Sequence, residues 1–303
     1  MRHPYLAALL IVLWAAVGNP GAAAETLDRT PRTAIMSAFE PEWTALQSML
    51  VGRKDFLVHG TLFLTGTIEH KPVVLFESGV SMVNASMTTQ LALDRFRIQK
   101  IAFSGIAGGV DTALEIGDVI VPDSWGEYLE TVFAREKDGV YTVPEFEEKP
   151  FPNFGMMFPQ AVRIATGGRE PEKRFWFPVD PRLLAAARRA MGAVTLKDCT
   201  PEHKCLLHKP KIVVGGHGVS GQAFVDNAAF REYARKTFDA SVLDMESAAV
   251  AHVAYANGTP FIAFRSLSDL AGGGAGENEM GTFFQLASDN SAAFVREFLK
   301  QLP

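Results

Sequence analysis

The chain has 303 residues, a net charge of −5 and 48% hydrophobic residues. That length suits one large domain with a substantial buried core. Lysine and arginine form no basic stripe, so the sequence lacks the charge distribution of a nucleic-acid-binding protein.

The first 24 residues have the pattern of a secretory signal peptide. A short basic start is followed by an apolar run at residues 6–17 and by three alanines at positions 22–24 that offer a cleavage site. An uncleaved membrane anchor is the alternative, but the run is short for a bilayer span and no later apolar stretch is long enough. We therefore expect a mature chain of residues 25–303, periplasmic or secreted, without membrane contact after cleavage.

The first half of the mature chain alternates strand and helix patterns. Apolar runs, alternation and glycine or proline breaks mark the elements. The pattern predicts a strand at 33–36, a helix at 41–50, a hairpin-like alternation at 58–68, a strand at 73–78, a helix at 84–95, a strand from 101 running into a glycine-rich turn that ends at 109, and a strand at 116–122.

The second half continues this alternation, which favours a layered α/β fold. The pattern predicts a helix at 181–191, a strand at 211–219, a helix at 227–237, a strand end at 242–245, a helix at 246–257 with Gly258 as its stop, a buried strand at 260–267, and a closing helix at 285–302.

Two segments, around residues 127–180 and 197–209, show little periodicity and are interpreted as surface insertions in a single domain. The first is expected either to form part of a pocket rim or to pack as ordered loop. The second contains Cys199 and Cys205, the two cysteines of the chain. A local disulfide is favoured in an oxidising compartment. Zinc binding with His203 and His208 matches no standard ligand spacing, and two free thiols remain possible.

Carboxylates follow three of the predicted strands. Glu42 lies on the first turn of a predicted helix, where the helix dipole favours an anion that accepts a proton. Met245-Glu246 opens another helix, and Ser268-Asp269 follows the buried strand. Each carboxylate alone has an ordinary explanation, as a helix-start Glu or as a turn or N-cap Asp. Their order along one chain is the more specific signal.

This order, with Ser-Gly-Ile-Ala-Gly-Gly at 104–109 and Ser-Gly-Gln-Ala-Phe-Val at 220–225, resembles the purine nucleoside phosphorylase and uridine phosphorylase superfamily. More narrowly, it is similar to the methylthioadenosine/S-adenosylhomocysteine nucleosidases. The resemblance covers most of the mature chain. It implies a three-layer α/β/α sandwich with a central mixed sheet, no metal or organic cofactor, and a homo-oligomer in which neighbouring subunits often complete the pocket.

The resemblance also implies roles for individual residues. Glu42 would be the base that activates water, Glu246 would accept hydrogen bonds from the ribose hydroxyls, and Asp269 would protonate N7 of the leaving purine, with a pKa raised by burial. Arg265 would make an ion pair or a subunit contact. The remaining expected substrate-binding residues are Gly79, Ala107 and Gly108 in the glycine-rich segments, Ile106 near the water or phosphate, Phe224 and Val225 at the purine, Met245 under the sugar, Ser268, and Met280 and Phe283 on the 5′ side.

The sequence departs from the family pattern at two of these places. Ile106 stands where a hydroxyl residue is usual, and Gln222 stands where an acid is usual. An isoleucine side chain cannot donate to phosphate, so hydrolysis is favoured over phosphorolysis. The prediction is an exported purine nucleosidase acting on methylthioadenosine- or S-adenosylhomocysteine-like nucleosides. A phosphate-dependent phosphorylase and a non-catalytic nucleoside-binding protein are the alternatives.

Overall fold

The computed structural model describes residues 25–165 and 170–303, so the predicted signal peptide lies outside the described residues. At its centre is a twelve-stranded mixed sheet. Its strands are β1 (Asp28–Ser37), β2 (Val51–Val58), β3 (Thr61–Ile68), β4 (Lys71–Glu77), β5 (Phe96–Gly109), β6 (Val119–Val121), β7 (Ser124–Glu127), β14 (Trp176–Pro178), β15 (Ile212–Val214), β16 (His217–Ser220), β17 (Ala240–Asp244) and β18 (Phe261–Asp269).

The sheet is mixed: β16 is parallel to β17 and β5 is parallel to β1, but β17 and β5 pair in antiparallel fashion. The strand order is β14-β7-β16-β17-β5-β1-β4-β3-β2, with β18 beside β5 and β6, and β15 beyond β6. β5 pairs in parallel with both β1 and β18. Every residue of β18 is buried. A strand covered on both faces is a near-continuous apolar run, which is why the sequence pattern located it.

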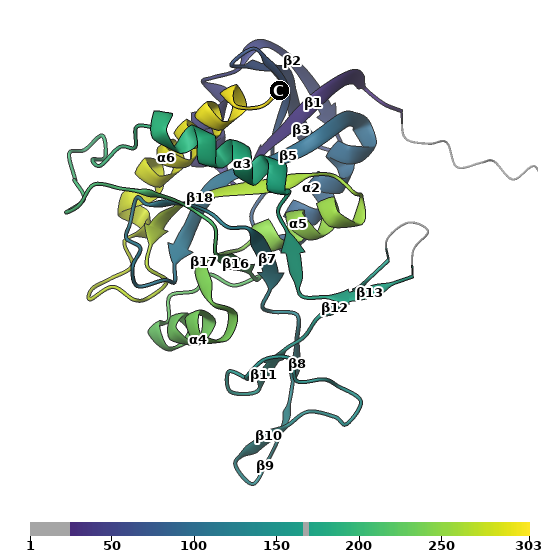
Figure 1. Cartoon of the computed structure of the whole chain (residues 1–303), viewed down its shortest axis with the longest axis vertical. Coiled ribbons are helices and arrows are strands. Elements are labelled where there is room, and N and C mark those ends of the chain that lie inside the picture. The colour runs from purple at the N-terminus through teal and green to yellow at the C-terminus, as the bar shows by residue number, and fades with distance from the viewer. Residues whose placement is uncertain (1–24, 166–169) are drawn as a thin grey trace, which may run out of the picture.

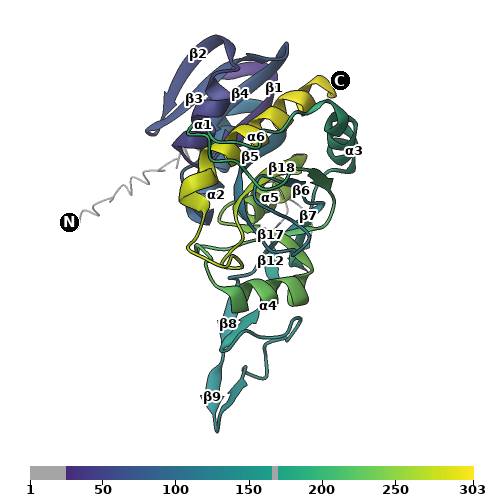
Figure 2. The same cartoon turned by 90° about the vertical axis from the view of Figure 1, so that its left-hand side faces the viewer.

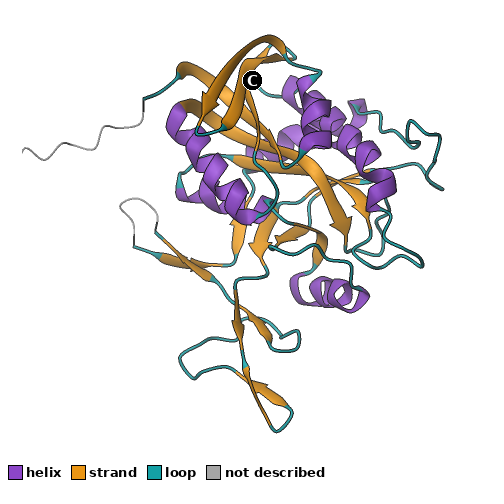
Figure 3. Cartoon of the chain, turned by 180° about the vertical axis from the view of Figure 1, so that it is seen from behind, coloured by secondary structure: helices purple, strands orange, loops and turns teal. Residues whose placement is uncertain are grey.

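Helices cover both faces of this sheet (Figures 1 and 3). On one side α6 packs on β18 and β5 and is flanked by α1 and α3, while α2 and α5 pack together on the other side. The predicted three-layer sandwich is confirmed. None of the helices in the described parts of the chain is long and apolar enough to cross a membrane. The helices are α1 (Glu40–Gln47), α2 (Met82–Arg95), α3 (Pro181–Ala190), α4 (Ala228–Phe238), α5 (Ser247–Ala256) and α6 (Met280–Lys300), and a short 3₁₀ turn covers Met191–Ala193.

The described residues between 131 and 174 form small strand pairs outside the main sheet. The part at residues 131–159 projects from the body, away from the C-terminus (Figures 1 and 2). Surface placement was expected for all of 127–180, but Phe177 is fully buried and β14 pairs with β7 in the main sheet. The aromatic run at 175–177 belongs to the core because it buries large apolar rings. The hairpins are β8 (Thr131–Phe133) with β11 (Met157–Pro159), β9 (Arg135–Lys137) with β10 (Val140–Thr142), and β12 (Val162–Ile164) with β13 (Glu172–Arg174).

Several predicted element boundaries were wrong, for physical reasons. Gly105, Gly108 and Gly109 continue β5 instead of forming a turn, because their backbones pair with β18 and β17. β2 was missed because nearly all of its side chains are exposed, so no alternation marks it. Gly215 and Gly216, both with positive φ, split the strand predicted at 211–219. The closing helix begins at Met280, five positions before the predicted start.

The second aperiodic segment is closed by a disulfide. Cys199 and Cys205 are bonded, with a sequence separation of 6. Their backbones also form an isolated antiparallel bridge. The predicted local disulfide is confirmed, and free thiols and a zinc site at these cysteines are excluded.

Candidate active site

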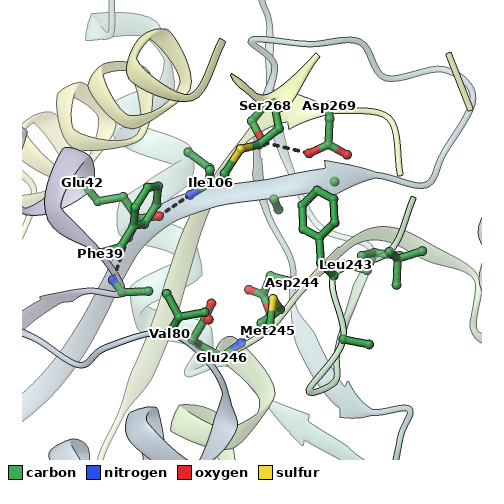
Figure 4. Close-up of a pocket in the computed structure, with 17 residues that line it drawn as sticks. Phe39, Glu42, Val80, Ile106, Leu243, Asp244, Met245, Glu246, Ser268 and Asp269 are labelled. Carbon is green, nitrogen blue, oxygen red and sulfur yellow. Dashed lines mark hydrogen bonds between the residues drawn. The ribbon is translucent and has the colours of Figure 1, made fainter. Parts of the chain in front are cut away.

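A cavity of about 190 Å³ lies where β1, β5, β16, β17 and β18 end. The crevice beyond strand ends is the usual ligand site of such sheets. Figure 4 shows Glu42 at one end, Asp269 at the other, and Glu246 on the wall opposite β5. Eleven of the predicted residues line it: Glu42, Ile106, Ala107, Gly108, Phe224, Val225, Met245, Glu246, Ser268, Asp269 and Met280.

Two predicted binding residues do not line the cavity. Gly79 has a φ of +78° and forms the turn that brings its neighbour Val80 to the wall instead. Phe283 points into a separate apolar cluster with Ile116 and Leu286. Its place on α6, one turn beyond Met280, turns the ring toward the core. Neither residue is therefore part of the cavity lining.

Glu42 is held rigidly on the first turn of α1. Its Oε2 accepts from the Ala38 N–H at 2.7 Å and its Oε1 accepts from the Ile106 N–H at 2.8 Å. The side chain is buried, and this burial raises its pKa to about 7 although Arg265 and the backbone hydrogen bonds lower it. The sequence-based expectation was that the helix dipole favours the deprotonated form, and burial shifts the pKa in the opposite direction. The carboxyl can exchange a proton near neutral pH.

A single guanidinium serves three carboxylates behind the cavity. Arg265 is 0% exposed, and its cation lies over the Phe103 ring, 4.0 Å from the centroid. Its Nη1 is 3.8 Å from Glu42 Oε1 and its Nη2 is 3.5 Å from Glu246 Oε2. Its Nε lies 2.7 Å from Asp244 Oδ2, outside hydrogen-bond geometry, and donates to Ser247 Oγ at 2.9 Å. The ion pair expected for Arg265 is present.

Glu246 precedes α5 with a non-helical backbone, φ −138° and ψ −40°. Its Oε1 accepts from the Ser81 N–H at 2.8 Å, which ties it to the start of α2. Burial raises its pKa to about 7 despite the nearby Arg265, and the neighbouring Asp244 adds to the rise. One guanidinium therefore does not keep all three carboxylates ionised.

Asp244 is a cavity residue that sequence reasoning missed. Its Oδ1 accepts from Ser220 Oγ at 2.5 Å and from the Glu246 and Ser247 N–H groups at 3.2 and 3.1 Å. It thereby orients the turn that presents Glu246. The available signal was an Asp at the end of a buried strand, two residues before a candidate ligand-binding Glu. Ala38, Phe39, Val80, Ala223 and Leu243 are further lining residues that were missed.

Asp269 is the last residue of β18 and is 4% exposed. Its Oδ1 accepts from the Ala271 N–H at 2.8 Å, and its Oδ2 accepts from Ser268 Oγ at 2.9 Å. Burial raises its pKa, and the hydrogen bonds from Ala271 and Ser268 work against that shift. A raised pKa is what the apolar strand before Asp269 led us to expect. A carboxyl with a raised pKa is suited to donate a proton.

Phe224 supplies an aromatic surface at the cavity, with 57% of the residue exposed. An exposed ring beside an apolar cavity can stack on a flat base. The following residue, Val225, is buried. Gln222 lies instead in a separate groove beside α2 and α5. Its departure from the family pattern therefore does not change the lining of the cavity.

The charge of the lining is all of one kind. Glu42, Asp244, Glu246 and Asp269 line the cavity together with apolar residues, and no lysine, arginine or histidine of the described chain joins them. Residues 25–165 and 170–303 also contain no group of three or more His, Cys, Asp or Glu side chains that could hold a metal ion. Such a lining suits a neutral ligand with hydroxyl groups and a flat apolar ring.

Comparison with known proteins identifies the superfamily of the chain. A model of the phosphorylase superfamily matches residues 32–300. The chain belongs to the phosphorylase superfamily. Within it, a 5′-methylthioadenosine/S-adenosylhomocysteine nucleosidase of Lysinibacillus sphaericus is 31% identical, over 80% of this chain and 87% of its own.

Two further similar proteins are informative. A nucleosidase of the same name from Colwellia psychrerythraea, solved in complex with adenine, is 26% identical and covers 89% of this chain and 95% of its own, with a TM-score of 0.68. Bark storage protein A of Populus deltoides is 28% identical over 81% of this chain and 79% of its own. The chain is thus similar both to proteins named nucleosidases and to one named a storage protein.

Proposed function

We propose that the protein is an exported purine nucleosidase that hydrolyses the N-ribosidic bond of methylthioadenosine- or S-adenosylhomocysteine-like nucleosides. The observation that carries the proposal is the placement of two carboxyls with raised pKa values, Glu42 and Asp269, at opposite ends of one small cavity. The similar nucleosidases of Lysinibacillus sphaericus and Colwellia psychrerythraea support it.

The arrangement fits the charge changes of the reaction. Breaking the bond between C1′ and the purine nitrogen leaves positive charge on the ribose and negative charge on the base. Asp269 donates a proton to the purine, which then leaves as a neutral base. Water adds to C1′ and gives its proton to Glu42. Glu246 accepts hydrogen bonds from the ribose hydroxyls, and the nearby carboxylates stabilise the cationic sugar.

The negatively charged side chains of the cavity favour water over phosphate as the nucleophile. Phosphorolysis needs cationic or amide donors for a dianion. Here the Ala38 and Ile106 N–H groups already donate to Glu42, and the side chain of Ile106 offers no donor. Arg265 is fully buried among carboxylates. A phosphate at this end would meet negative charge without a free cation.

Export and assembly belong to the proposal as well. The signal-peptide pattern of residues 1–24 supports export, as does the disulfide between Cys199 and Cys205, because such bonds persist in oxidising compartments. We further propose a homo-oligomer, which rests on the family resemblance of the sequence.

A second candidate function is nucleoside binding or storage without turnover. Both oxygens of Glu42 accept backbone hydrogen bonds, and the adjoining Ile106 is apolar, which leaves few groups to hold a water for attack. The similarity to bark storage protein A favours the same reading. In this case the cavity would bind the nucleoside and release it unchanged.

The test is release of free base from methylthioadenosine, S-adenosylhomocysteine, adenosine and inosine, with and without phosphate, by wild type and Asp269→Asn. The proposal predicts release without phosphate that falls by at least about a hundredfold in the variant, while nucleoside still binds. Exposed Asp239→Asn, at the end of α4, is the matched control. Tight binding with no release would establish the binding protein, and release only with phosphate would establish a phosphorylase.

A further inference from the structure

The loop that follows Asp269 has little structure of its own. This closing loop, residues 270–279, connects the end of β18 to the start of α6. Asp269 and Met280 flank it, and both line the cavity. Its glycines at 273, 274 and 276 are exposed. Because glycine restricts the backbone least, contacts with neighbouring segments must fix the loop's position.

The neighbour is the loop that carries the aromatic wall. This base-side loop, residues 221–227, contains Phe224 and Val225. The Asn227 N–H donates to the Ala271 carbonyl at 3.2 Å, near the start of the closing loop. Toward the far end of that loop, Asn278 Nδ2 donates to Asp226 Oδ1 at 3.0 Å. The base-side loop is therefore joined to the closing loop near both of its ends.

Asn278 has a further contact that fixes its side chain. Its Oδ1 accepts from the Met280 N–H at 2.9 Å, an Asx turn at the start of α6. Burial raises the pKa of Asp269, and Asn278 acts in the opposite direction. One side chain thus joins the base-side loop to the start of α6, and it also lowers the pKa of the carboxyl proposed to protonate the base.

We propose that Asn278 is a positioning residue that latches the closing loop to the base-side loop through Asp226, and so holds Asp269 and Phe224 about the same purine. The identity of the ligand rests on the proposed function. The latch acts on binding and release of the base, because opening it separates the two loops that enclose the purine end of the cavity. Asn278 itself does not line the cavity.

The test uses the full chain with adenine as probe, since its dissociation can be measured without turnover. Asn278→Ala and Asp226→Ala should each speed adenine dissociation about fivefold, the value of one ordinary hydrogen bond. The double variant should be no faster than Asn278→Ala alone, because without Asn278 the Asp226 side chain has no latch contact left to lose. Asp226→Asn keeps the accepting oxygen and should restore the slow rate. The matched control is Glu277→Gln, an exposed substitution in the same loop.

Additive effects in the double variant, or wild-type dissociation in both single variants, would overturn the latch. KM and kcat give a second readout, with KM expected to rise more than kcat falls. If the wild type binds adenine but releases no base from nucleosides, the nucleosidase proposal is contradicted. The adenine dissociation rates of the variants then support or refute the latch by themselves. A wild type that binds no adenine would overturn both.

Discussion

Raising the pH from about 5 to about 8 is expected to destabilise the protein, because two buried carboxyls must then ionise. Burial raises the pKa values of Glu42 and Glu246 from 4.5 to about 7. Between these values the folded state keeps protons that the unfolded state has lost. Stability is therefore full below about pH 4.5 and is lost as the pH rises toward 7.

The magnitude follows from the shift. A difference of about 2.5 pKa units corresponds to about 3 kcal/mol for each carboxyl that ionises in the folded state. Glu42→Gln removes one of these groups. It also lowers the pKa of Glu246, since the charge of Glu42 contributes to that rise. We expect the variant to lose less than half as much free energy of unfolding as wild type over the same pH range.

The assay is urea unfolding at several pH values, with the free energy of unfolding extrapolated to water. Glu40→Gln is the control, because this exposed carboxyl lies on the same helical turn and leaves the buried cluster intact. The reasoning is refuted if wild-type stability stays level or rises from about pH 5 to 8. It is also refuted if Glu42→Gln declines as steeply as wild type.

Three other outcomes are expected. Phe224→Ala should raise the dissociation constant of adenine by about tenfold, the value of one stacked base, as isothermal calorimetry can show. Gly105→Ala should lower both base release and the melting temperature, because its Cβ would overlap the buried Arg265 guanidinium and Glu42. The control is Gly276→Ala, whose Cβ meets no atom within 4 Å and which should change neither quantity. Replacing Cys199 and Cys205 by serine should cost at most about 2 kcal/mol of unfolding free energy, because the closed loop is short, and a larger loss in urea unfolding would contradict this estimate.

The sequence by itself picked out most of the carboxylates that line the cavity. Glu42, Glu246 and Asp269 each follow a buried strand whose apolar run is visible in the sequence, and strand ends of a layered α/β fold converge on one crevice. The local disulfide was also predictable, since both cysteines lie within one short segment. These features follow from short-range sequence patterns, which can be recognised without knowing how the chain packs.

The tertiary structure decided the environment of those side chains. It placed Arg265 among Glu42 on α1 and the Asp244–Glu246 turn, which lie far apart in the sequence. Burial there raises the pKa of Glu42, whereas its helix position alone favours the anion. The tertiary structure also turned Phe283 into the core and brought Asp244 to the cavity wall. Desolvation and charge pairing depend on residues far apart in sequence, and no local pattern encodes how closely the chain packs them.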